Sequence, residues 1–124
     1  MLSIEEVNKI LDEVASELPQ DFFKDLNGGI ILNEGYKMHP ESINGDLYIM
    51  GQYQYTTSMG RYIVIYYGSF EKVYANAGKA VLKEKLRSVL LHEFRHHLES
   101  LAGEDDLEVQ DKIDLAKYKQ KHNK

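Results

Sequence analysis

Two histidines and a glutamate of this sequence are spaced so that they could act together on one metal ion. Residues 92–96 read HEFRH, an HExxH motif. On a helix, His92 and His96 share one face, so both imidazoles can bind the same ion. Glu93 lies roughly 100° further round the helix, where it can accept a proton from a metal-bound water. The motif predicts one zinc ion per chain, bound by His92 and His96, with Glu93 as the catalytic general base.

The motif falls inside a long predicted helix. Apolar residues recur at helical spacing from about Lys79 to Ala102, over a broad arc that is typical of a central helix. Gly103 is the expected end of this helix, and a second helix follows over about 104–121. The two helices together must position the metal-binding residues.

The remainder of the chain predicts one helix followed by short strands. Residues 4–18 carry an apolar stripe, with Ser3 and Glu6 as a capping box. Residues 29–32, 46–55 and 61–68 have the composition of strands, and Gly51 is a candidate bulge. The order of helix, strands, helix and helix predicts an α+β fold with a small mixed or antiparallel sheet. Residues 1–124 show no linker or repeat, which favours a single domain.

Composition narrows the possible partners and chemistry. The 124 residues include no cysteine, which excludes disulfides, thiolate zinc sites and cysteine nucleophiles. The formal net charge of −5 disfavours binding to nucleic acids or anionic membranes. No apolar run approaches the length of a membrane span, and no signal peptide is visible. We therefore expect a cytoplasmic protein with neither a nucleic-acid nor a membrane partner.

The motif and its surroundings resemble a known family. Residues 92–97, HEFRHH, follow a strand such as RYIVIYYG (61–68) and a connecting helix, as in the small zincin-like metallopeptidases of bacteria. The resemblance runs from roughly Gly45 to Asp111. It implies a minimal zincin-like fold, a zinc cofactor and a peptide or protein substrate. It also implies that His92 and His96 are zinc ligands and that Glu93 is the catalytic base.

The third metal ligand is less clear, because the sequence departs from the commoner family pattern HExxHxxGxxD. Here the Gly-x-x-Asp element lies four residues late, at Gly103 and Asp106, a shift of about 6 Å of helix rise. If Gly103 closes a helical hairpin, Asp111 comes level with His96. We therefore rank Asp111 first, followed by Glu108 and Asp106. The alternative for each of these three acids is that its side chain lies on a solvent-exposed helix face and binds no metal.

Four neighbouring side chains carry weaker expectations. His97 lies about 100° from the ligand face and is expected to be a hydrogen-bonded neighbour or core residue. His39 is a loop residue that could line the cleft. In zincins the strand beside the active-site helix binds extended substrate. If residues 61–68 form that strand, Tyr66 or Tyr67 could face the metal and stabilise an oxyanion.

Two functions are compatible with these residues. The first is a zinc-dependent peptidase that uses metal-activated water and Glu93. The second is a zincin-fold protein that binds a metal or a partner with little or no hydrolytic activity. A chain of this size leaves room only for a short, open cleft, which keeps the second possibility open.

Overall fold

The computed structural model describes the backbone of residues 1–103 and 106–122, and the side chains of residues 1–103 and 111–121. The elements, in chain order, are α1 (Ile4–Ser16), a 3-10 turn (Gln20–Phe23), β1 (Gly29–Asn33), β2 (Lys37–Met38), β3 (Tyr48–Ile49), β4 (Gly51–Thr56), β5 (Gly60–Tyr66), α2 (Tyr67–Tyr74), α3 (Lys79–Ala102) and α4 (Asp106–His122). The predicted α+β fold is confirmed.

Helix α1 begins with the predicted capping box. The hydroxyl of Ser3 accepts the main-chain N–H of Glu6 at 3.2 Å, and the Glu6 carboxylate accepts the N–H of Ser3 at 3.2 Å. These two bonds satisfy N–H groups that have no partner within the helix. The helix ends at Ser16, two residues earlier than the apolar stripe predicted. Its buried stripe packs on α3, which carries the HExxH motif.

The main sheet has three strands in the order β1-β5-β4. β5 is central, parallel to β1 and antiparallel to β4. The predicted strand 61–68 is too long, because the chain turns into α2 at Tyr67. The predicted strand 46–55 is divided at Met50 into β3, which pairs with β2 in a small second sheet, and β4.

Gly51 is not a bulge, contrary to the sequence-based expectation. It pairs in regular register with Ile65 of β5. A Cβ atom at this position would lie 2.9 Å from Cγ1 of Val89 on α3 and 3.1 Å from Cδ1 of Ile65. The missing side chain therefore allows α3 to lie directly against β4, beside the HExxH motif.

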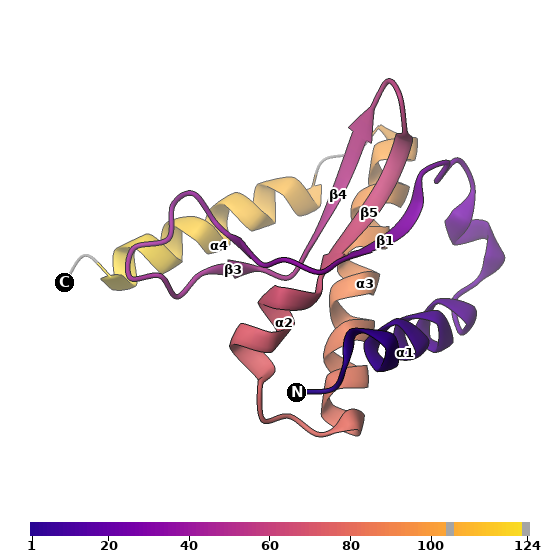
Figure 1. The fold of residues 1–124 in the computed structure, drawn as a ribbon. Coiled ribbons are helices and arrows are strands. Elements are labelled where there is room, and N and C mark those ends of the chain that lie inside the picture. The colour runs from indigo at the N-terminus through magenta and orange to yellow at the C-terminus, as the bar shows by residue number, and fades with distance from the viewer. Residues whose placement is uncertain (104–105, 123–124) are drawn as a thin grey trace.

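The core lies between one face of the sheet and the helices α1 and α3 (Figure 1). Ile63 and Ile65 of β5 point into it and are fully buried. Alternate residues of a strand point to opposite faces, so Tyr62 and Tyr66 lie on the face away from α3. This alternation decides which side chains of the sheet can reach the motif.

The predicted helix 79–102 is confirmed, with Gly103 at its C-terminal cap in the left-handed region, φ 76°. α4 turns back from this end of α3 and diverges from it toward the segment before β3 (Figure 1). Of the helices in the described ranges, none has the length and apolarity that crossing a membrane requires.

Candidate metal centre

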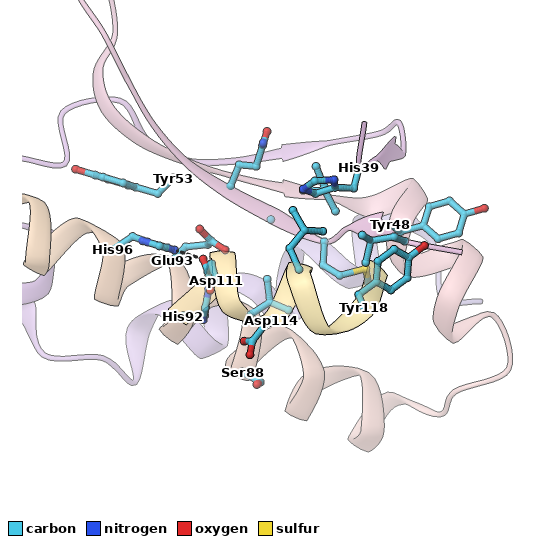
Figure 2. Close-up of a pocket in the computed structure, with 17 residues that line it drawn as sticks. His39, Tyr48, Tyr53, Ser88, His92, Glu93, His96, Asp111, Asp114 and Tyr118 are labelled. Atoms are coloured by element: carbon cyan, nitrogen blue, oxygen red, sulfur yellow. Dashed lines mark hydrogen bonds and ion pairs between the residues drawn. The ribbon is translucent and has the colours of Figure 1, made fainter. Parts of the chain in front are cut away.

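Three potential metal ligands converge between α3 and α4. Nε2 of His96 lies 3.0 Å from Oδ2 of Asp111, and Nε2 of His92 lies 3.5 Å from the same oxygen. The donor atoms of the three residues all lie within 4.8 Å of one another. Figure 2 shows this group at one end of a pocket, with Tyr48 and Tyr118 toward the other.

The spacing and chemistry of these donors fit a zinc ion. Ligand atoms at about 2.0–2.1 Å from a tetrahedral zinc lie about 3.3 Å from one another, close to the two measured separations from Asp111. Two imidazoles and one carboxylate are a usual ligand set for a catalytic zinc and leave a fourth position open. His92 and Asp111 are each about two-fifths exposed, so the open side of the group faces solvent.

Glu93 lies beside this group in a much less polar setting. Its side chain is on the neighbouring face of α3 and only 7% of the residue is exposed. Burial raises the pKa of Glu93 to about 7, an effect to which the nearby Asp111 adds. The His92 ring and a hydrogen bond from the main-chain N–H of Tyr53 act in the opposite direction. A carboxyl group with such a pKa is suited to exchanging protons near neutral pH.

The free edge of the sheet borders the same site. The N–H of Tyr66 donates to the carbonyl of Met50 at 2.9 Å. Because inward and outward pairs alternate along antiparallel strands, the backbone groups of Gly51, Tyr53 and Tyr55 point away from β5. β4 is the outer strand, so these groups lie at its open edge, facing α3 and the candidate metal ligands.

A pocket of about 680 Å³ joins the edge of β4 to the candidate ligands. Its walls come from α3, from β3 and β4, and from α4. The lining residues are His39, Leu47, Tyr48, Ile49, Met50, Gly51, Gln52, Tyr53, Ser88, Val89, His92, Glu93, His96, Asp111, Asp114, Leu115 and Tyr118. The expectation that His39 could line the cleft is confirmed. The volume falls within the range of small-ligand sites.

The structure brings together only part of the set chosen from sequence. His92, Glu93, His96 and Asp111 are adjacent, and Asp111 is the acid ranked first. The side chains of the other two candidates, Glu108 and Asp106, lie outside the described residues.

The expectation that Tyr66 or Tyr67 faces the metal is wrong. Tyr66 lies on the far face of the sheet, where its hydroxyl donates to Oε1 of Gln52 at 3.0 Å. Tyr67 begins α2, and its hydroxyl donates to the carbonyl of Leu2 at 2.6 Å. The expectation assumed that 61–68 is the strand beside the active-site helix. That strand is β4, and β5 is covered on both edges.

His97 is a hydrogen-bonded core residue, as the sequence predicted. It is fully buried, and both ring nitrogens have partners, the hydroxyl of Tyr53 and the carbonyl of Lys24. Tyr53 was missed by the sequence analysis. A signal for it existed, since Glu93 and His97 are four residues apart and must share a helix face that points at some neighbour.

Comparison with known proteins gives two findings. Residues 45–114 match the family described as zincin-like metallopeptidase, and this span contains the HExxH motif and Asp111. A solved structure, a conserved hypothetical protein from Thermus thermophilus, is 29% identical, with a TM-score of 0.68. The similarity covers 82% of this chain and 98% of that protein. A search of curated proteins finds no match.

Proposed function

Because this chain belongs to the family of zincin-like metallopeptidases, we propose that it is a zinc-dependent peptidase with Glu93 as general base. One observation carries the proposal. Three donors of a zinc-type ligand set converge within 4.8 Å of one another, and a buried glutamate lies directly beside them. The family match supports the class of protein, and the geometry supports the assignment of roles to residues.

Each residue has a role that follows from its position. His92 and His96 on α3 and Asp111 on α4 would hold the ion. A zinc ion bound in this way would lower the pKa of a bound water toward neutrality and polarise a carbonyl group. Glu93 would accept a proton from water and pass it on to the leaving amine. Burial raises the pKa of its carboxyl group, which makes Glu93 a stronger base for this proton.

The open edge of β4 supports a peptide as the substrate. An extended peptide can add to a free strand edge through main-chain hydrogen bonds. Gly51 and Tyr55 direct their main-chain groups outward on this edge, while the N–H of Tyr53 lies close to the Glu93 carboxylate. A peptide bound there would pass between β4 and α4, with a backbone carbonyl group close to the candidate ligands.

The test uses Glu93→Gln, which keeps the size of the side chain and removes its ability to accept the proton. We expect the zinc content to equal that of the wild type, and cleavage of a peptide found by library screening to fall by about a hundredfold or more. Glu84→Gln is the matched control, because Glu84 lies on the same helix, 70% exposed and paired with Arg87. It should leave cleavage unchanged. Undiminished cleavage by Glu93→Gln would contradict the role of Glu93.

The alternative is a protein of this family that binds zinc or a partner with little hydrolytic activity. It is favoured by the exposure of His92 and Asp111, which leaves a bound ion open to solvent on one side. A zinc-loaded wild type that cleaves no member of a broad peptide library would favour this alternative over the peptidase.

A further inference from the structure

Helix α3 carries two interleaved pairs of residues with the same spacing. His92 and His96 form the first pair, and Glu93 and His97 form the second, offset by one position. Residues four apart lie on one face, so α3 presents two adjacent faces. The first faces Asp111 on α4. The second faces β4, where both of its members contact the same residue.

That residue is Tyr53, which approaches the helix through both its side chain and its main chain. Its hydroxyl lies 2.9 Å from Nδ1 of His97, and its main-chain N–H is close enough to the Glu93 carboxylate to lower the pKa of that group. The aromatic ring of Tyr53 also packs against the imidazole of His97, with centroids 5.3 Å apart. The side chain of this strand residue is thus bound to the same face of the helix toward which its main-chain N–H is directed.

The second nitrogen of His97 fixes the direction of these bonds. Nε2 lies 2.7 Å from the main-chain carbonyl of Lys24. A carbonyl oxygen can only accept, so Nε2 carries a proton and donates, and in the neutral imidazole Nδ1 then accepts the hydroxyl proton of Tyr53. His97 is fully buried, and an imidazole that uses both nitrogens in a dry site cannot turn without leaving a polar atom unpaired. It is therefore a rigid support for Tyr53.

We propose that His97 and the side chain of Tyr53 are positioning residues, which keep the N–H of Tyr53 close to the Glu93 carboxylate and fix the edge of β4 relative to the metal-binding face of α3. A carboxylate with one N–H nearby can still accept from a water, because it has further lone pairs. The contact between Tyr53 and His97 then sets both the orientation of the Glu93 carboxylate and the distance between the edge of β4 and the candidate metal ligands. This inference rests on the proposed function, because only a catalytic Glu93 makes its orientation matter for turnover.

Amide hydrogen exchange, followed by NMR on the full chain with and without zinc, tests the contact independently of activity. Tyr53 and Tyr55 both point their N–H groups to the free edge of β4, so Tyr55 is the internal control. We expect the amide of Tyr53 to exchange more slowly than that of Tyr55, and Tyr53→Phe to accelerate exchange at position 53 about tenfold, as loss of one buried hydrogen bond predicts. Equal exchange at 53 and 55 in the wild type would overturn the proposal.

A matched variant separates this effect from the general loss of a hydroxyl group. Tyr62→Phe removes a hydroxyl of similar burial that donates to Gln54 on the opposite face of the sheet. It should leave exchange at position 53 within about twofold of the wild type. An equal acceleration by Tyr62→Phe and Tyr53→Phe would mean that the sheet loosens as a whole, which overturns the specific role of His97.

Kinetics give the second measurement. In Tyr53→Phe and His97→Leu, we expect kcat to fall about 10- to 100-fold, the usual effect of losing a supporting contact, with KM and zinc affinity near wild-type values. His97→Gln retains a donor and an acceptor and should keep more of kcat than His97→Leu. A parallel fall in zinc affinity and kcat would overturn the positioning role. A wild type that cleaves no peptide contradicts the proposed function. In that case the amide exchange measurement still tests whether His97 and the side chain of Tyr53 hold the edge of β4.

Discussion

Replacing Gly51 by alanine should separate β4 from α3 and reduce stability by an amount that can be worked out from the contacts. The added Cβ would lie 2.9 Å from Cγ1 of Val89, 3.1 Å from Cδ1 of Ile65 and 3.2 Å from the carbonyl oxygen of Val64. Ordinary carbon–carbon contacts are about 3.5–4.0 Å, so the contact with Val89 is too short by about 0.6–1.1 Å.

Two effects compete in this variant. Overpacking of this kind costs about 1–3 kcal/mol, since Val89 is β-branched and cannot turn its methyl group away at little cost. Alanine also restricts the unfolded chain more than glycine does, which returns about 0.4–1 kcal/mol. We therefore expect a net loss of about 1–2 kcal/mol in the free energy of unfolding, because the steric term is the larger.

Urea denaturation of the metal-free protein measures this loss, with Val89→Ala and the double variant completing a cycle. Removing the methyl groups of Val89 relieves the shortest contact, so the double variant should be more stable than the sum of the two single changes predicts. Cleavage by Gly51→Ala should fall as well, because the edge of β4 moves away from Glu93. If Gly51→Ala is as stable as the wild type, or if the effects of Gly51→Ala and Val89→Ala on stability are additive, α3 does not approach β4 closely at this glycine.

Two further predictions concern the metal. Asp111→Ala should weaken zinc binding at least about tenfold, because it removes one of the three proposed ligands. Asp114→Ala, one turn along α4, should not weaken it. Asp106→Ala and Glu108→Ala test the other two acids, and an unchanged zinc affinity in Asp111→Ala would exclude Asp111 as a ligand. Zinc at a hundred times its dissociation constant should stabilise the protein by about 2.7 kcal/mol. Adding a chelator should therefore lower Tm, and this fall should be absent in a variant with both His92→Ala and His96→Ala.

The elements that carry the motif could be predicted from the sequence because local signals define them. Helix α3 has the predicted bounds because its apolar periodicity is strong and Gly103 can adopt the left-handed conformation that ends it. Asp111 could be placed near His96 because a short connection between two helices limits where the second can go. These inferences require no knowledge of contacts that are distant in sequence.

The order of the strands could not be predicted in this way. Residues 61–68 look like the strongest strand because β5 is the central one, buried through contacts with β1 and β4. A central strand has no free edge, so the strand with the clearest sequence signal cannot add an extended peptide at its edge. The wrong expectation that Tyr66 or Tyr67 faces the metal follows from this. Strand order depends on pairing between residues far apart in sequence, and the direction in which each tyrosine side chain points depends on where the strand ends.

The attachment of α4 at two places has a consequence for how the pocket is assembled. Near its start, Asp111 meets the two histidines. Further along, the hydroxyl of Tyr118 accepts the N–H of Ile43 at 3.0 Å and Lys119 pairs with Glu41. Each attachment raises the effective concentration of the other, because a helix held at one place needs to search little space to bind at the second. A zinc ion bound by His92, His96 and Asp111 would strengthen the first attachment, so we expect zinc binding to stabilise the position of this wall of the pocket.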